Sequence, residues 1–495
     1  MAVLLIHESG DVRLEITADG GISADPESIL VSYPKGTVII LLVLVSIALQ
    51  GADWSRFRGP NGEGVADGKP LPVTFSSTDK VGWMTEVPFG QSSPIVVGNR
   101  VFLTAAEGKS LLTIAYDAAT GRELWRKEAP RARTQPIYKA NDPASSTPAA
   151  DDKALYVFFP DFGLISYSFD GKERWRLPLG PFDNFYGLST SPVIAGNQLI
   201  LLCDQVRGSF LLSLDKDTGK QRWKTERRDR MEGWSVPIIY DDQIVTFGST
   251  HLDSYYLGTG EARWWMPISA NGAIGTPVIH NGRLLVSYLG MDKPWLPSFA
   301  STIEKLDKNR DGKLSQEESK ADQEWSEHFG WIDRDHDGLI QAAEWDDARQ
   351  LGVGEFGAIS LRLEGKGRLD PSKAVAWRFQ RNVPYIPTPI LYKGIYYMVK
   401  SGGIVTALDP ATGKLLKQGR SERALGEYYA SPVAGDGKLY IVSNEGKVSV
   451  LQAGADWQVV SVNDLGEDVF ATPAISNGCL FVRTRGRLYC FNGPK

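Results

Sequence analysis

A repeated unit of four short strands constrains the fold of this chain more than any other feature. One copy occupies residues 190–223, TSPVIAGNQLILLCDQVRGSFLLSLDKDTGKQRW. Three apolar runs rich in β-branched residues are separated by turn residues, and a fourth run surrounds Trp223. Alternation with a period of two, broken by Gly, Asn and Asp, predicts four antiparallel strands joined by hairpins. Such a small sheet cannot bury both faces alone, so the unit must pack against copies of itself.

The last turn of the unit has a specific chemistry, Asp215-x-x-Thr218-Gly219. The Asp carboxylate can accept a backbone N–H two residues on, and Gly adopts a positive φ without a Cβ clash. Trp223 follows and is expected to cover the sheet with its large apolar face. The same end of the unit recurs around Trp125, Trp175 and Trp264.

Eight copies of the unit are marked by a proline that usually follows Ser or Thr. These prolines are Pro94, Pro148, Pro192, Pro237, Pro277, Pro389, Pro432 and Pro473. Their spacing is 40 to 54 residues, except for one interval of 112 residues. A period of this length with four strands per repeat is typical of a β-propeller. The last repeat ends before its fourth strand, and Gly82–Thr85 has the character of that strand. We therefore predict an all-β, eight-bladed propeller that closes by pairing its two ends.

The long interval contains two twelve-residue segments with the pattern of an EF-hand calcium loop. Ca²⁺ takes six to eight oxygen ligands, which this loop supplies from positions 1, 3, 5, 7, 9 and 12, with Gly at position 6 for a sharp turn. Both segments match at every position, so we predict two calcium ions. The expected ligands are Asp307, Asn309, Asp311, Lys313, Ser315 and Glu318 in the first loop, and Asp333, Asp335, Asp337, Leu339, Gln341 and Glu344 in the second, with Lys313 and Leu339 using their carbonyl oxygens.

The surroundings of the two loops support this interpretation. Residues 302–350 hold 14 acidic and 7 basic residues, and the flanking stretches 299–306, 317–331 and 343–351 have the pattern of amphipathic helices. Leu314 and Ile340, at position 8 of each loop, are expected to pair as a short β-bridge. The second loop carries four ligand carboxylates and the first carries three, so we expect the second to bind calcium more tightly. A solvated acidic hairpin is the alternative.

The insertion divides the chain into four segments. We expect it to interrupt a hairpin of the fifth blade, because strand-like runs resume near residues 358–363 and 374–378. The segments are 1–52 (N-terminal extension and signal peptide), 53–291 (lead-in and blades one to five, first part), 292–366 (the EF-hand pair) and 367–495 (the remaining blades).

Composition limits the partners and the compartment. The net charge of −5 does not suit phosphate neutralisation, so nucleic acid is not expected as a partner. The three cysteines form no CxxC or CxxCH motif, and whether Cys479 and Cys490 pair is left open. Residues 38–49 are apolar except for Ser46, which suits the core of a signal peptide and predicts a periplasmic or secreted protein. A signal anchor or a buried strand is the alternative. We expect a monomer.

The opening Trp54-x-x-Phe57-Arg58-Gly59-Pro60-x-Gly62, followed by the Ser/Thr-Pro and Asp-x-x-Thr-Gly…Trp repeats, resembles the exported bacterial propellers with pyrroloquinoline-quinone (PQQ)-like repeats. That family includes quinoprotein alcohol dehydrogenases and the propeller lipoprotein of outer-membrane protein assembly. The resemblance implies the fold and leaves the activity open. The chain lacks the adjacent cysteine pair of the dehydrogenases, their CxxCH haem motif and the Cys that follows the signal in the lipoprotein.

In propellers of this family, the loops that precede each Ser/Thr-Pro meet at one mouth of the central channel. Here they would bring together cationic and aromatic side chains, which suit an unknown protein, a peptide or an anionic glycan. Ordinary solvated loop polarity is the alternative interpretation. The candidate mouth residues are Arg133, Asp183, Tyr186, Arg230, Trp234, Asn271, Arg381, Tyr385, Arg423, Glu427 and Tyr428.

The sequence favours a scaffold or ligand-binding propeller over an enzyme. It contains no G-x-S-x-G elbow and only five histidines, none in a recognisable catalytic pattern. The alternative is a PQQ-dependent alcohol or sugar dehydrogenase, which would need an aromatic platform such as Trp234 under the cofactor. We do not expect PQQ.

Overall fold

The computed structural model describes residues 2–6, 12–16, 53–131, 133–135, 137–138, 141–227 and 231–493. The chain divides into two compact units, residues 1–49 and residues 50–495. In the first unit, β1 (Ala2–Ile6) and β2 (Val12–Ile16) form an antiparallel hairpin. The predicted signal-peptide core at residues 38–49 lies outside the described residues.

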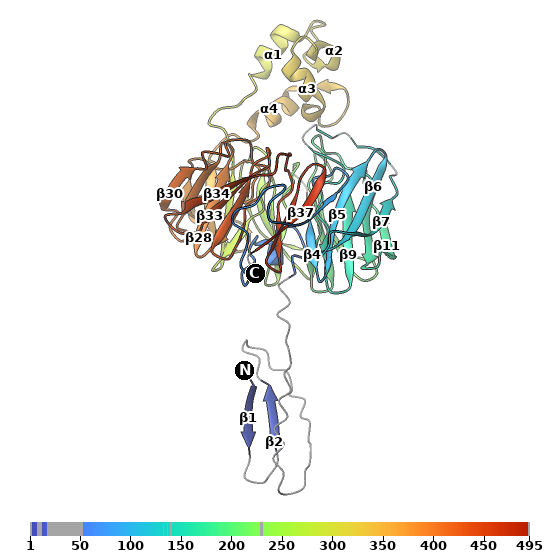
Figure 1. The fold of residues 1–495 in the computed structure, drawn as a ribbon. Coiled ribbons are helices and arrows are strands. Elements are labelled where there is room, and N and C mark those ends of the chain that lie inside the picture. Colours follow the sequence, from blue (N-terminus) through green and yellow to red (C-terminus); the bar gives the residue numbers. More distant parts are fainter. Residues whose placement is uncertain are drawn as a thin grey trace, which may run out of the picture. The chain divides into compact units, whose positions relative to one another are not determined.

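The second unit contains a ring of eight sheets, which confirms the predicted eight-bladed propeller (Figure 1). The four propeller strands of each sheet pair antiparallel, and they follow one another in chain order from the channel outward in the first four blades. These strands are β4 (Ile95–Val97), β5 (Arg100–Glu107), β6 (Ser110–Asp117), β7 (Glu123–Ala129), β8 (Ala149–Ala150), β9 (Ala154–Phe159), β10 (Gly163–Ser168), β11 (Glu173–Pro178), β12 (Val193–Ala195), β13 (Gln198–Cys203), β14 (Phe210–Asp215), β15 (Gln221–Glu226), β16 (Ile238–Tyr240), β17 (Gln243–Phe247), β18 (His251–Tyr256) and β19 (Ala262–Pro267).

The other four blades contain the insertion and the ring closure. The insertion lies between the second and third strands of the fifth blade, and the eighth blade takes its outer strand, β3, from the beginning of the ring. The strands are β20 (Val278–His280), β21 (Arg283–Tyr288), β24 (Gly357–Arg362), β26 (Val375–Phe379), β27 (Ile390–Tyr392), β28 (Ile395–Lys400), β29 (Ile404–Leu408), β30 (Leu415–Arg420), β31 (Val433–Gly435), β32 (Lys438–Val442), β33 (Lys447–Gln452), β34 (Gln458–Asp464), β35 (Ala474–Ser476), β36 (Cys479–Arg483), β37 (Arg487–Asn492) and β3 (Val81–Glu86).

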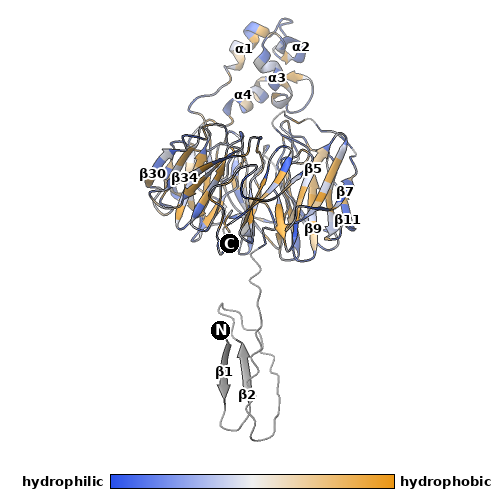
Figure 2. Ribbon diagram, in the orientation of Figure 1, coloured by the Kyte–Doolittle hydropathy of each residue, from blue (hydrophilic) through white to orange (hydrophobic). Residues whose placement is uncertain are grey.

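The two middle strands of each blade are the core of the ring. Every residue of β9 is buried, whereas the outer strand β11 of the same blade is only partly covered. The difference arises because a middle strand packs against a neighbouring blade on both faces, and its sequence is accordingly almost continuously apolar (Figure 2). The fourth blade gains a fifth strand that the sequence did not predict, β25 (Gly367–Arg368), which runs parallel to β19.

In five of the eight blades, a tryptophan of the outer strand donates a hydrogen bond to the following blade. The indole of Trp83 donates to the Ala118 carbonyl at 2.9 Å, and that of Trp175 donates to the Lys216 carbonyl at 2.8 Å. In both cases the carbonyl belongs to the Asp-x-x-Thr-Gly turn of the following blade. Gly121, in the turn beneath Trp83, has a φ of 72°, and a Cβ there would lie 2.4 Å from the indole. The turn therefore needs Gly both for its backbone conformation and for the close approach of the ring.

The lead-in from residue 53 crosses several blades before the ring begins. Trp54 pairs with Val96 of the first blade, and Val65 pairs with Ala434 of the seventh. The short 3₁₀ helix η1 (Pro60–Gly62) lies between these two contacts. Arg58 is fully buried there, and burial lowers the pKa of its guanidinium to about 9.

The insertion is a small helical module at one face of the ring (Figure 1). Its helices are α1 (Phe299–Leu306), α2 (Gln316–Ser319), α3 (Gln323–Ile332) and α4 (Ala342–Gln350), and one further short helix, α5 (Pro371–Ala374), precedes β26. The expected helix over 317–331 is thus two helices. Trp325, Phe329, Trp331 and Trp345 belong to the buried core of the module. In the part of the chain that the structure describes, no helix is long and apolar enough to span a membrane.

Candidate metal centre and propeller mouth

The second twelve-residue loop brings its carboxylates together. Asp333, Asp335 and Asp337 each place an oxygen within 4.8 Å of the others. Asp333 is buried, and its Oδ1 has no hydrogen-bond partner. Burial, together with the negative charges of Glu344 and Asp337, raises the pKa of Asp333. An unpaired buried oxygen beside two further carboxylates is the environment that a hard divalent cation stabilises.

The backbone of this loop is already curved around that cluster. The N–H of Gly338 donates to Asp333 at 3.1 Å, and the N–H of Leu339 donates to Asp337 at 2.8 Å. Glu344, the last ligand position, accepts from the N–H groups of Arg334 and Gln341 at 2.8 and 3.0 Å. The short strand β23 (Leu339–Ile340) follows the turn and leads into α4.

The first loop has the same backbone scheme. Asp307 accepts from the N–H of Gly312 at 2.9 Å, and Asp311 accepts from the N–H of Lys313 at 2.8 Å. Glu318 accepts from the N–H and the hydroxyl of Ser315, and these bonds lower its pKa to about 2. The short strand β22 (Leu314–Ser315) pairs with β23, and Leu314 lies opposite Ile340 as the sequence predicted.

The two loops fit calcium because their donors are hard oxygens in the order that such a site needs. Asn309, at position 3 of the first loop, supplies an amide oxygen where the second loop has the carboxylate of Asp335. The number of ions stays a prediction.

The module is held on the propeller through a buried carboxylate. Glu232, in the loop before the fourth blade, accepts from the N–H of Phe185 at 2.5 Å and from the indole of Trp331 at 2.9 Å. Burial raises the pKa of Glu232 to about 7. Glu232 could not be predicted as a contact residue, because nothing near it in the sequence marks a contact with a helix 99 residues away.

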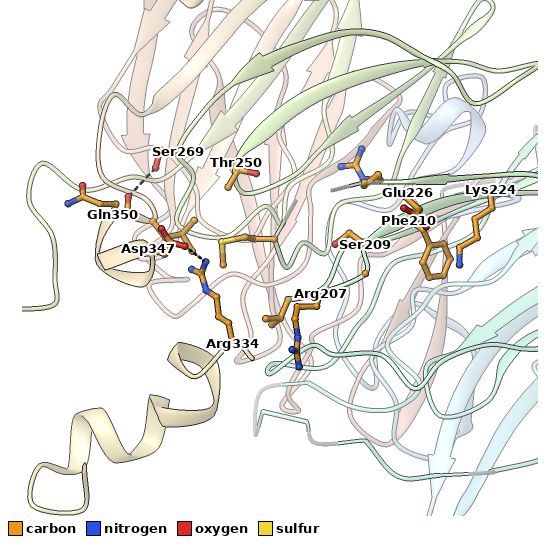
Figure 3. A pocket seen from close by; sticks show the side chains of 15 residues that line it. Arg207, Ser209, Phe210, Lys224, Glu226, Thr250, Ser269, Arg334, Asp347 and Gln350 are labelled. Atoms are coloured by element: carbon orange, nitrogen blue, oxygen red, sulfur yellow. Dashed lines mark hydrogen bonds and ion pairs between the residues drawn. The ribbon is translucent and has the colours of Figure 1, made fainter. Parts of the chain in front are cut away.

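A cleft of about 850 Å³ lies between the module and blades three and four (Figure 3). Arg207 and Lys224 stand on the propeller side, and Arg334 and Asp347 stand on the module side. Arg334 donates to Asp347 at 3.2 Å. The charges of the cleft are thus largely paired with protein groups.

The central channel is lined by hydroxyl groups, which explains the recurring Ser/Thr-Pro. The backbone N–H of one such residue donates to the hydroxyl of its counterpart in the following blade, as Thr147 does to Ser191 at 3.0 Å. Seven of eight possible links are present, and the ring is broken where Val236 replaces Ser or Thr. The links are Ser93 to Thr147, Thr147 to Ser191, Val236 to Thr276, Thr276 to Thr388, Thr388 to Ser431, Ser431 to Thr472 and Thr472 to Ser93.

Aromatic side chains meet at the mouth of this channel. Tyr186 makes edge-on contacts with Tyr138 and Trp234, at ring distances of 5.3 and 5.7 Å. Tyr138 and Tyr385 are among the most exposed aromatic side chains of the ring, at 42% and 45%. Burial raises the pKa of Tyr186 to about 12, so its phenol stays neutral. Three blades thus contribute to one aromatic surface.

The predicted cationic rim is not gathered in the same way. Arg133 donates to the Pro160 carbonyl at 2.9 Å and also to the Leu179 carbonyl, and it lies over Phe182. Arg381 lies over Phe379 at 5.6 Å. The guanidinium groups of both are engaged by the protein, so they do not form an anion-binding cluster.

The remaining candidates are dispersed. Tyr428 is buried and donates to the Ala424 carbonyl, so its prediction as a mouth residue was wrong. Arg423 and Glu427 are exposed on the loop before the seventh blade, and Asn271 is exposed in the loop before the fifth. Asp183 faces the helical module instead of the channel, where it contacts His336. Arg230 lies outside the described residues.

The central channel is narrower than a typical site for a planar quinone cofactor. Its cavity measures about 130 Å³, whereas pockets for ligands of that size are typically about 300–1,000 Å³. The described residues that line it include Trp234, Tyr429, Phe470 and Phe57 besides the hydroxyl ring, and none is charged. The carboxylates of PQQ would find no cation among them. Cys479 and Cys490 are separate thiols in this structure.

The ring of eight repeated sheets, with one inserted pair of helix–loop–helix units, defines the protein as a β-propeller built from sequence repeats. A family model described as outer membrane protein assembly factor BamB (PQQ_2) matches residues 64–184, 114–289 and 334–493. The chain belongs to this family of PQQ-like repeat propellers. An EF-hand model matches residues 299–318, which include the first loop.

Individual relatives include enzymes and an assembly factor. A polyvinylalcohol dehydrogenase of Pseudomonas sp. is 29% identical over 251 residues, which are 40% of this chain and 38% of that protein. A second polyvinylalcohol dehydrogenase, of Sphingopyxis sp., is 27% identical over 36% of this chain and 29% of its own length. The chain thus spans less than half of the length of either enzyme. The assembly factor BamB of Yersinia pestis is 20% identical over 64% of this chain and 77% of that protein.

Solved structures share the fold at low identity. A europium-containing methanol dehydrogenase aligns with a TM-score of 0.58 at 10% identity, over 89% of this chain and 98% of that one. BamB of Moraxella catarrhalis aligns with a TM-score of 0.50 at 12% identity, over 83% and 97%. These likenesses support the propeller fold alone.

Proposed function

We propose that this chain is an exported, calcium-binding propeller that binds a protein or peptide at its aromatic mouth and catalyses no reaction. The carboxylate cluster of Asp333, Asp335 and Asp337 carries the calcium part of the proposal. Calcium there would brace the module against the ring. The apolar run at residues 38–49 supports export, and the likeness to an outer membrane assembly factor is consistent with a scaffold role.

The mouth favours a peptide or protein segment over an anionic glycan. Its surface is formed by Tyr138, Tyr186 and Trp234, while Arg133 and Arg381 are engaged by carbonyl groups and aromatic rings. Aromatic side chains give a large contact area at a low cost in conformational entropy. An anionic ligand would need free guanidinium groups, so it is the weaker candidate.

A PQQ-dependent dehydrogenase is the second candidate, because two relatives that match part of this chain are polyvinylalcohol dehydrogenases and the chain belongs to a family of PQQ-like repeats. The small, uncharged channel argues against it. Incubating the chelator-washed full-length protein with PQQ and calcium, then with alcohols and a redox dye, separates the two functions. We expect calcium binding by isothermal titration calorimetry without dye reduction. A quinone absorbance shift together with dye reduction would contradict the scaffold proposal.

The mouth is tested with partners from a native envelope fraction. The wild type and a Tyr186→Ala variant serve as baits, with Leu124→Ala as the control because Leu124 is exposed at 38% on the outer strand β7, away from the loops of the mouth. We expect a protein captured by the wild type and by Leu124→Ala but lost with Tyr186→Ala. Equal capture by all three would contradict binding at the mouth.

A further inference from the structure

The two calcium loops differ in their contacts with the propeller. Arg207 donates to the main-chain carbonyl of Asp335 at 3.1 Å, and His336 contacts the carboxylate of Asp183 at 3.1 Å. Both Asp335 and His336 belong to the second loop. Among the described residues, no hydrogen bond or ion pair joins the first loop to the propeller. Arg310, which occupies in the first loop the position of His336 in the second, is exposed.

We propose that the propeller supplies positioning residues to the second calcium loop, so that its calcium affinity depends on contacts made by blades three and four. This inference rests on the proposed calcium function. The positioning residues are Arg207 and Asp183, from the loops around the third blade, and Glu232, from the loop before the fourth. They touch the loop or its entering helix and leave the ligand carboxylates free.

The contact of Arg207 shows how this works. Its guanidinium binds the carbonyl oxygen of Asp335, so the side chain of Asp335 remains available to the ion. The same guanidinium lies 3.5 Å from Asp183, which in turn holds His336, the next residue of the loop. Two consecutive loop residues are therefore fixed from outside the loop.

Glu232 fixes the helix that enters the loop. It accepts from the indole of Trp331, which stands two residues before Asp333, the first ligand. An EF-hand loop binds best when its entering helix and its backbone already have the bound arrangement, because less ordering is then required on binding. Within the described part of the ring, the first loop has no such support, so we expect its affinity to depend on its own sequence.

The coupling must operate in both directions. If docking raises the calcium affinity of the second loop, calcium in that loop raises the stability of docking by the same factor. The third and fourth blades would therefore exchange backbone hydrogens more slowly around residues 183–185 and 231–233 when calcium is present. The large cleft between the module and these blades would be held in one arrangement.

The test uses the full-length chain and the Arg207→Ala variant. Its matched control is Arg222→Ala, which removes the same charge from the same blade and breaks an ion pair with Asp215 of 2.9 Å, within a turn outside the module contact. Calcium titration calorimetry should show one site weakened about fivefold or more in Arg207→Ala, the other site unchanged, and both sites unchanged in Arg222→Ala. In the absence of calcium, backbone hydrogen exchange at residues 331–337 should be faster in Arg207→Ala than in the wild type and unchanged in Arg222→Ala.

The outcomes separate this inference from the proposed function. Two calcium sites in the wild type with unchanged affinities in Arg207→Ala would overturn the positioning role and leave the calcium function standing. An absence of calcium binding in the wild type would overturn both. Glu232→Gln provides a second variant, because it removes the carboxylate behind Trp331 without touching the loop. It should weaken the same site as Arg207→Ala, and weakening of the other site would count against the proposal.

Discussion

Replacing Asp335 by Asn should convert the second calcium loop into a close copy of the first. Asn keeps an oxygen ligand at position 3 and removes one charge, which is the natural state of the first loop at Asn309. The effect on affinity therefore isolates the charge. The structure allows its size to be estimated, because the distances between the carboxylates are known.

Removing the charge of Asp335 has two opposing effects on calcium binding, because it weakens the attraction to the ion and relieves the repulsion between the carboxylates. Ligand oxygens lie about 2.4 Å from calcium. With the dielectric constant of water, which suits the exposed Asp335, the attraction of one carboxylate to the divalent ion is about 3.5 kcal/mol. Removing that charge also relieves repulsion with Asp333 and Asp337, about 0.9 kcal/mol each at the 4.8 Å limit. The net loss of about 1.7 kcal/mol corresponds to a roughly 20-fold weaker site.

Isothermal titration calorimetry on chelator-washed protein measures this directly. We expect the second loop to be the tighter site in the wild type, Asp335→Asn to bring it close to the first, and Asn309→Asp to tighten the first by a similar factor. Asp346→Asn is the charge-matched control, since Asp346 lies in α4 outside the ligand positions. Equal or tighter binding by Asp335→Asn, or an effect of Asp346→Asn as large, would refute the electrostatic reasoning.

Three further predictions concern the stability of the ring. Gly121→Ala should lower the free energy of unfolding by about 2–4 kcal/mol, from the strained φ and the lost indole contact, whereas Gly98→Ala, with positive φ but no atom within 4 Å, should lose only about 1 kcal/mol by calorimetry. The pKa of Glu232 is raised from 4.5 to about 7 in the folded protein, so between these pH values the folded state binds a proton that the unfolded state has lost. The free energy of unfolding should therefore fall as pH rises from 4.5 to 7, by up to about 3 kcal/mol in total. Urea unfolding in chelator at pH 5 and 8 tests this, and an equal slope in Glu232→Gln would contradict it. Val236→Thr should complete the hydroxyl ring with the N–H of Ser191 and raise the unfolding free energy by about 1 kcal/mol, and an unchanged or lower melting temperature would speak against that link.

Much of the fold could be predicted because its signals are local and repeated. The period of 40–45 residues gives the number of blades, and the incomplete last repeat predicts the closure by β3. The candidate calcium ligands could also be named from the sequence, since an EF-hand loop places all of them within twelve consecutive residues. Even the pairing of Leu314 with Ile340 follows from the position of each residue in its loop.

The mouth could not be predicted in the same way. A loop sequence shows which side chains are present but not the direction in which each one points. In the folded protein, Arg133 donates to a backbone carbonyl and Tyr428 is buried in the core. The roles of the Trp and Ser/Thr of each repeat were also hidden. Both contact the following blade, so their partners lie far away in the sequence, 35 residues from Trp83 and 54 residues from Ser93.

By itself, the sequence determined the ring of eight blades and the two oxygen-rich loops, because periodicity, turn chemistry and ligand spacing act over a few residues. Only the tertiary structure decided how the helical module sits on the ring. His336 meets Asp183 across 153 residues, and Trp331 meets Glu232 across 99. No pattern in the chain encodes such pairs. They arise because the closed ring brings the loops of blades three and four to the face on which the fifth blade carries its insertion.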